Sequence, residues 1–146
     1  MYLQYLKKIK SLTSISLALN ASYILHSSRF SQRTLNKLMI LDILYATQTG
    51  NAETIAKKLQ ILAKNQGFNV NMVEMNYHNI NTFRQLRNVA IVTSTYGDGE
   101  VPEMGIDFWK ELKSSKVEMI NLKYGLIALG DKSHKIFCGA GKAISK

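Results

Sequence analysis

The sequence predicts an α/β fold: a doubly wound parallel sheet with helices on both faces. Apolar runs rich in strand-forming residues alternate with segments whose apolar residues recur at helical spacing. Such alternation of strands and helices is typical of a parallel sheet. Three of the apolar runs also end in short segments of Gly, Ser and Thr. Ligands of open α/β sheets bind at the carboxyl ends of the strands, so these segments are the first candidates for a site.

The elements follow one another in chain order. The first strand, residues 40–46, is mostly apolar, and the helix after it repeats apolar residues at helical spacing from Ile55 to Ala63 before Gly67 ends it. The strand at 89–95 is an apolar run of the buried type, and another apolar strand lies near the end of the chain. The complete expectation is strands 40–46, 69–75, 89–95 and 124–129, with helices 51–65, 80–87, 105–115 and one that begins near residue 137.

The turn after the first strand has the chemistry of a phosphate site. A strand that turns straight into a helix points unpaired N–H groups and the positive end of the helix dipole at the turn. Thr47 and Thr49 add hydroxyl donors, and Gly50 allows close approach to the backbone. The turn has no lysine and lacks both the Walker A and the Gly-x-Gly-x-x-Gly patterns, so a phosphomonoester fits better than ATP or NAD. The alternative is a well-capped turn without a ligand.

The other two strands that end in small residues carry similar loops. Ser94-Thr95-Tyr96-Gly97-Asp98-Gly99-Glu100 follows one of them. Leu129-Gly130-Asp131-Lys132-Ser133-His134 follows the other, with Phe137-Cys138 just beyond. Together with residues 47–53, these segments resemble the three FMN loops of the flavodoxin family. The FMN domains of diflavin reductases, such as the sulfite reductase flavoprotein and the microsomal cytochrome reductase, are most similar, as are related small flavodoxins.

This resemblance covers residues 39–146 and implies a flavodoxin-like sheet of strand order 2-1-3-4. The fifth strand and the last helix of the family have no counterpart after Lys146, so we expect the strand at 124–129 to form an exposed edge. A fragment, a split gene product and a truncated reading frame are all open alternatives. We give little weight to the N-terminal tail as a cover for this edge, because it has no evident strand pattern.

The resemblance also implies which residues contact FMN. Tyr96 would stack on the flavin, and the peptide at Gly97 would turn its carbonyl to the ring on reduction. His134 stands where the diflavin relatives have a tyrosine, so stacking on that side should be weaker. For Phe137 and Cys138, core packing is the favoured alternative to flavin contact. The implied set is Thr47, Gln48, Thr49, Gly50, Asn51 and Ala52 for the phosphate, Thr95, Tyr96, Gly97 and Gly99 for the ring, and Leu129, Gly130, Asp131, His134, Phe137 and Cys138 for the remaining side.

The implied function is one-electron transfer by bound FMN in the cytoplasm. The donor would be an NADPH- and FAD-containing reductase and the acceptor a haem or iron–sulfur protein, docked at an acidic rim. Other hypotheses remain: an FMN-domain fragment of a diflavin reductase without activity of its own, a non-redox phosphate-binding module, and a membrane-surface adaptor. The expected rim consists of Asp98, Glu100, Glu103 and Asp107.

The charge distribution separates residues 1–38 from residues 39–146, and we expect a domain boundary there. Residues 1–38 contain six basic residues and no acid. The remainder contains 13 basic and 10 acidic residues, so it contributes only +3 to the net charge of +9. The second part is close to balanced, which argues against nucleic acid binding. The apolar stretch Leu12–Leu25 is too short and too polar to span a bilayer. A loosely helical extension, the remnant of another domain, and a targeting or weak membrane-surface segment are the alternatives.

The cysteine and histidine content excludes further classes of site. A single cysteine, Cys138, rules out an internal disulfide and any multi-cysteine zinc or iron–sulfur site. His26, His78 and His134 lie far apart in the sequence and have no metal-ligand spacing.

Overall fold

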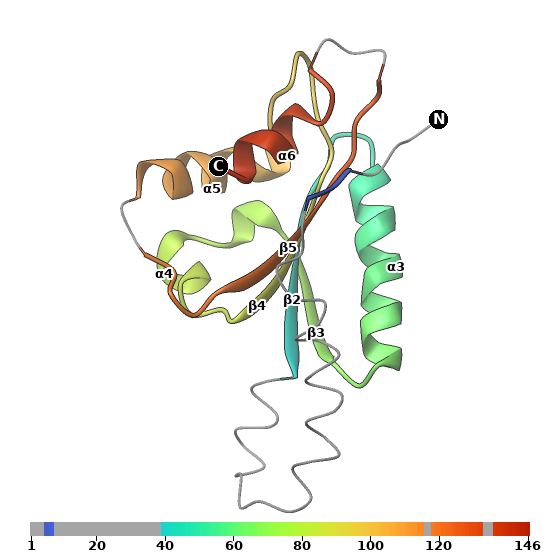
Figure 1. Ribbon diagram of the computed structural model, residues 1–146, viewed down its shortest axis with the longest axis vertical. Coiled ribbons are helices and arrows are strands. Elements are labelled where there is room, and N and C mark those ends of the chain that lie inside the picture. The colour runs from blue at the N-terminus through green and yellow to red at the C-terminus, as the bar shows by residue number, and fades with distance from the viewer. Residues whose placement is uncertain (1–4, 8–38, 116–117, 133–135) are drawn as a thin grey trace, which may run out of the picture.

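The computed structural model describes residues 5–7, 39–115, 118–132 and 136–146 (Figure 1). Four parallel strands form the body of the sheet: β2 (Ile40–Ala46), β3 (Asn69–Glu74), β4 (Asn88–Thr93) and β5 (Lys123–Ala128). Their order is β5-β4-β2-β3, so the predicted 2-1-3-4 order is confirmed. Because all four run the same way, the loops that follow β2, β4 and β5 meet at one edge of the sheet.

A fifth strand, β1 (Tyr5–Lys7), pairs with the outer edge of β5. The pairing is antiparallel, and its register places Tyr5 opposite Ala128 and Lys7 opposite Leu126. Our expectation that the N-terminal segment would leave this edge open was therefore wrong. A three-residue strand is too short to show a period-2 pattern in the sequence, and its partner lies some 120 residues away.

The helices lie on both faces of the sheet, as Figure 1 shows. Helix α3 (Asn51–Asn65) covers one face, and its bounds match the prediction. Helices α4 (Ile80–Phe83), α5 (Glu103–Ser114) and α6 (Gly139–Ile144) lie on the other, together with the 3₁₀ turn η2 (Met75–Tyr77). Helix α4 is four residues shorter than the predicted 80–87. Its start is fixed by Asn79, whose Oδ1 accepts the N–H groups of Asn81 and Thr82 at 3.0 Å each.

Two apolar clusters hold the layers together. Under α3, Ala52 and Ala56 are fully buried against Ile43 and Val92, and these small side chains let the helix lie close to the sheet. On the other face, Phe83 and Phe108 meet edge to face with ring centroids 5.0 Å apart. Phe108 is therefore part of the core. Trp109 is half-buried and lines a groove between α5 and α6 instead.

No helix within the described ranges combines the length and the apolar character that a membrane span requires. The stretch Leu12–Leu25 lies outside those ranges.

His78, which follows η2, makes stability sensitive to mild acid. Burial lowers the pKa of His78 below its usual 6.5, although the charge of Asp42 opposes the shift. The folded protein therefore favours the neutral ring, and the unfolded chain binds a proton more readily below about pH 6.5. We expect the free energy of unfolding to fall as the pH drops from about 7 to 5.5, and His78→Gln to remove part of that fall. Urea unfolding at both pH values measures it. An equal or steeper fall in the variant contradicts the prediction.

Candidate functional site

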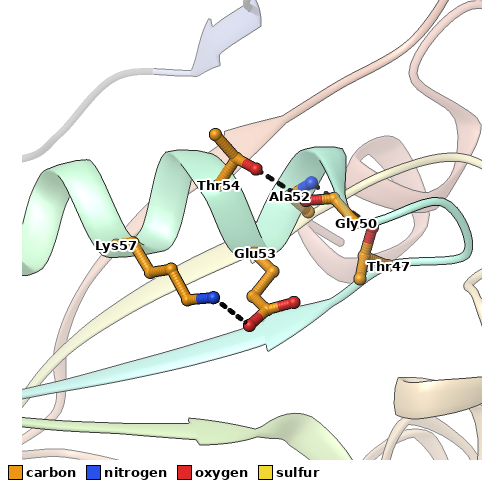
Figure 2. Close-up of polar contacts among 6 residues, drawn as sticks. All are labelled: Thr47, Gly50, Ala52, Glu53, Thr54 and Lys57. Carbon is orange, nitrogen blue, oxygen red and sulfur yellow. Dashed lines mark hydrogen bonds and ion pairs between the residues drawn. The ribbon is translucent and has the colours of Figure 1, made fainter.

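The loop after β2, residues 47–50, turns directly into α3 (Figure 2). Thr47 is buried, and its Oγ1 accepts the N–H of Ala52 at 3.3 Å, which fixes the loop to the first turn of the helix. Gly50 occupies the N-cap with φ of +81°, a left-handed conformation that favours glycine, and it has no side chain to cap the helix. Its carbonyl accepts both the N–H and the Oγ1 of Thr54, at 3.0 and 3.1 Å.

This loop presents donors without acceptors. Among the described residues, nothing accepts the N–H groups of Gly50, Asn51 and Glu53. Space around the turn is open, because a Cβ added at Gly50 would meet no atom within 4 Å. Lys57 lies one turn further along α3, but its Nζ is 2.6 Å from Glu53 Oε1, as Figure 2 shows. The arrangement fits an anion held by neutral donors and the helix dipole rather than by a cation.

Ser94 adds a further donor that the sequence reasoning missed. It comes directly after β4, and its N–H donates to the carbonyl of Ala46 at 3.0 Å, which places it beside the start of the first loop. The residue is buried, and its Oγ has no hydrogen-bond partner among the described residues. A buried hydroxyl without a partner costs about 1–3 kcal/mol, so a native structure that keeps one calls for an explanation. A ligand oxygen beside the loop would supply the missing partner.

The loop after β4 forms a tight turn that projects Tyr96. The Tyr96 carbonyl accepts the N–H of Gly99 at 3.1 Å and that of Glu100 at 2.8 Å, and the Tyr96 N–H donates back to the Glu100 carbonyl at 3.0 Å. Gly97 and Gly99 have φ of +51° and +135°, which side chains rarely adopt. The Tyr96 side chain is 53% exposed, so its ring face is available to a planar ligand.

The loops after β4 and β5 are held against each other. Thr95 Oγ1 donates to the carbonyl of Leu129 at 3.0 Å. The first residue of α6 lies so close to the turn that a Cβ added at Gly139 would be 2.5 Å from the Gly99 carbonyl oxygen. Any side chain at Gly139 would therefore push the two loops apart.

The third loop begins at Leu129, which is buried, and its remaining predicted residues divide between surface and core. Gly130 lies against Cys138, since a Cβ added there would be 2.7 Å from the Cys138 nitrogen. Cys138 is fully buried with φ of +52°, and its Sγ donates to the Ala128 carbonyl at 3.6 Å. Burial also raises the pKa of this thiol, so the sulfur stays protonated and supports the loop from below.

The other predicted residues of this loop and of the rim are placed as follows. Asp131 is exposed and Phe137 is half-buried, whereas His134 lies outside the described residues. The four acids of the predicted rim are all exposed, and Asp107 Oδ1 lies 3.9 Å from Lys110 Nζ. Within the part of the chain that the structure describes, no three His, Cys, Asp or Glu side chains are grouped so that they could hold a metal ion.

Comparison with known proteins gives consistent results. The sequence model of the family described as Flavodoxin matches residues 43–146. The sulfite reductase [NADPH] flavoprotein alpha-component of Shewanella sp. (strain MR-7) is 43% identical over 101 residues, which cover 68% of this chain and 17% of that protein. The chain thus matches less than a fifth of the length of this curated relative.

Two solved structures share the fold. A flavodoxin of Streptococcus pneumoniae TIGR4 is 28% identical with a TM-score of 0.63, and the match covers 73% of this chain and 72% of that one. A Fusobacterium nucleatum flavodoxin bound to flavin mononucleotide has a TM-score of 0.61 at 20% identity, over 73% of this chain and 62% of that one.

Proposed function

Because the chain belongs to the flavodoxin family, we propose that it binds FMN across the three loops and carries single electrons between redox proteins. The observation that supports this most strongly is the group of donors in and beside the first loop that have no hydrogen-bond partner among the described residues, the buried Ser94 hydroxyl included. A phosphomonoester has enough acceptor oxygens to satisfy these donors. FMN carries such a group at the end of its ribityl chain.

Each loop has its own task in this proposal. The N–H groups of Gly50, Asn51 and Glu53 bind the phosphate together with the hydroxyls of Thr49 and Ser94. Leaving cations out of this cradle avoids extra positive charge near the cofactor, which favours a low potential. Bound FMN supplies one-electron redox chemistry through its ring system.

The second and third loops hold the ring. Tyr96 covers one face of it and excludes water there. The peptide at Gly97 would offer its carbonyl to the ring, and Gly99 would keep the loop close. Leu129, Gly130 and Asp131 flank the opposite side of the cofactor.

The partners are redox proteins. We propose an NADPH- and FAD-containing reductase as the donor and a haem or iron–sulfur protein as the acceptor, both in the cytoplasm. The exposed acids Asp98, Glu100, Glu103 and Asp107 would steer a basic partner to the edge of the sheet where Tyr96 is exposed. Steering of this kind raises the association rate more than the affinity.

A second candidate is the FMN part of a diflavin reductase. The observation that favours it is the match to a sulfite reductase flavoprotein of which the chain covers 17%. The flavin site is the same in both cases. The difference lies in whether the donor reductase is a separate protein or part of the same polypeptide.

Titration of the full chain with FMN tests the proposal. With about 31 non-hydrogen atoms at ~0.3 kcal/mol each, FMN should bind with ~9 kcal/mol. That figure corresponds to a Kd of about 0.2 µM. Quenching of flavin fluorescence or calorimetry measures it, with riboflavin and inorganic phosphate as controls that isolate the two ends of the ligand. Binding of phosphate alone, with no gain from the flavin, would favour the non-redox module, and no binding of either would contradict the proposal.

Replacing Tyr96 tests the ring contact. Tyr96→Ala should weaken FMN binding roughly fivefold or more, because offset stacking contributes about 1 kcal/mol beyond burial. Tyr96→Trp should preserve the affinity, since indole offers a larger face. Stability should change little in both variants, because the side chain is exposed in the absence of ligand. Equal affinities in the alanine and tryptophan variants would show that the ring does not contact the flavin.

A further inference from the structure

The two edges of the sheet carry opposite charge. At the carboxyl edge, the acidic rim is joined by Glu53 in the first turn of α3 and by Glu74, the last residue of β3. The cations Lys57 and Lys110 near that edge are paired with Glu53 and Asp107. The opposite, amino-terminal edge lies where the strands begin and where α3 and α5 end (Figure 1). That edge carries mostly cations.

Five exposed cations lie at the amino-terminal edge, and we call them the basic edge. Lys64 and Lys113 stand in the last turns of α3 and α5, and Arg84 follows the end of α4. Arg87 comes directly before β4 and Lys123 opens β5; the Arg87 carbonyl accepts the Lys123 N–H at 2.7 Å, so these two residues are neighbours. None of the five forms an ion pair with another described residue. Their charge is therefore available to a partner.

Three acids lie toward the same edge and do not cancel this charge. Asp42 is buried in β2, where its Oδ1 accepts the Nδ2 of Asn71 at 2.8 Å, while Glu111 is half-buried and Glu118 is exposed. Even with all three counted, the five cations leave an excess of two positive charges. The acids of the carboxyl edge are too far away to matter, because a six-residue strand is ~20 Å long and the Debye length is about 8 Å at physiological salt.

Two exposed apolar side chains stand among these cations. Ile120 is 85% exposed and Tyr124, which follows Lys123, is 49% exposed. The turn that carries Ile120 is well anchored, since Met119 and Leu122 on either side pack against the core and the Leu122 N–H donates to the Met119 carbonyl at 3.1 Å. Ile120 is thus held outward on a firm support, beside positive charge.

We propose that the basic edge docks on an anionic lipid membrane, with Ile120 and Tyr124 entering the layer between headgroups and acyl chains. Lys and Arg side chains close to an anionic bilayer gain from its negative surface potential. An aliphatic residue and a tyrosine gain from the interfacial layer itself. The proposal goes beyond FMN binding and does not depend on it.

Anionic lipid fits these features better than a nucleic acid or an acidic protein. The five cations come from different segments along one edge, which suits a plane of charge that needs no fixed register. The phosphate backbone of a nucleic acid attracts the cations but offers an aliphatic side chain such as Ile120 no gain. The same bilayer repels the acidic rim at the other edge, so the three loops would face away from the membrane, where a redox protein can reach them.

Co-sedimentation of the full chain with vesicles tests this docking. The protein should bind phosphatidylcholine vesicles that contain about 30% phosphatidylserine at least tenfold more tightly than pure phosphatidylcholine, and about 0.5 M salt should weaken that binding. Hydrogen exchange shows which edge is in contact. Vesicles should slow the exchange of amides 118–124 and leave amides 96–100 unchanged.

Charge variants give the matched comparison. The double variant Arg87→Glu/Lys123→Glu should bind the anionic vesicles at least tenfold more weakly. Lys58→Glu/Lys132→Glu changes the net charge equally, but Lys58 lies in the middle of α3 and Lys132 at the carboxyl edge, so it should bind within about twofold of the unaltered protein. Ile120→Ser should weaken binding roughly threefold or more without changing its salt dependence.

A second pair of substitutions keeps the result decisive. Lys64→Gln/Lys113→Gln alters two other elements and should weaken vesicle binding roughly tenfold. The proposal is overturned if the unaltered protein binds both kinds of vesicle equally, or if both the Arg87→Glu/Lys123→Glu and the Lys64→Gln/Lys113→Gln variants bind as it does. Duplex DNA supplies the other overturning result. Binding to DNA that is tighter than to anionic vesicles, and that Ile120→Ser does not change, would assign the basic edge to a nucleic acid.

Discussion

Gly139→Ala is expected to lower the free energy of unfolding by about 2 kcal/mol and to weaken FMN binding roughly tenfold or more. The added methyl would lie 2.5 Å from the Gly99 carbonyl oxygen, and both sides of that contact are backbone, so neither can rotate away. Relief requires the loops after β4 and β5 to separate, which would displace Tyr96 from the ring. Urea unfolding and FMN titration measure the two effects.

The control for this variant is Gly67→Ala, which lies after α3 and away from the three loops. Its φ of +85° makes alanine cost about 1 kcal/mol, while the nearest atom to the new methyl is Met39 Cε at 3.6 Å. We expect a loss of stability there without a loss of FMN affinity. If Gly139→Ala changed stability alone, in the manner of Gly67→Ala, the join between the two loops would not position the cofactor.

Ser94→Ala is expected to separate stability from binding. The variant removes a buried hydroxyl that has no hydrogen-bond partner within the described part of the chain, so the ligand-free protein should keep its stability or gain up to about 1 kcal/mol. FMN affinity should fall roughly 10- to 100-fold, because a hydrogen bond to a charged group contributes about 1.5–3 kcal/mol. Thermal unfolding of the ligand-free protein measures the expected gain in stability. Titration with FMN, and thermal unfolding in its presence, measure the expected loss of affinity.

Thr93→Val provides the matched comparison one residue earlier. Thr93 is also buried, but its Oγ1 already donates to the Ser94 carbonyl at 2.9 Å. That variant should lose stability and retain FMN affinity. The assignment of Ser94 to the phosphate is wrong if Ser94→Ala binds FMN as tightly as the unaltered protein.

The parts of the fold that the sequence predicted are those with strong local signals. Residues 40–46 form the expected strand because they are a continuous apolar run. Residues 51–65 form the expected helix because apolar residues recur there at helical spacing, with Gly50 before the helix and Gly67 after it. The length of helix α4 was overestimated, because the Asn79 capping box fixes where the helix begins and does not determine where it ends.

The site was predictable as a set of loops but not in each of its side chains. Ser94 and Thr95 are adjacent hydroxyl residues with the same chemistry. Only the structure shows that Thr95 ties two loops together, while the Ser94 hydroxyl has no partner among the residues that the structure describes. Core packing of Cys138 was the favoured alternative from the sequence, but its close contact with Gly130 follows from the packing of α6 against β5, which no local pattern records.

The pairing of β1 with β5 has a consequence for how the protein is made. Residues 5–7 leave the ribosome before their partners, residues 126–128, which follow about 120 positions later. At about 5–20 residues per second, the early segment waits roughly 6 to 24 s before it can pair. Contacts of such long sequence separation form slowly, so the outer border of the sheet should close last. During that interval nascent chains are most exposed to mispairing with one another, and chaperones would have their greatest effect then.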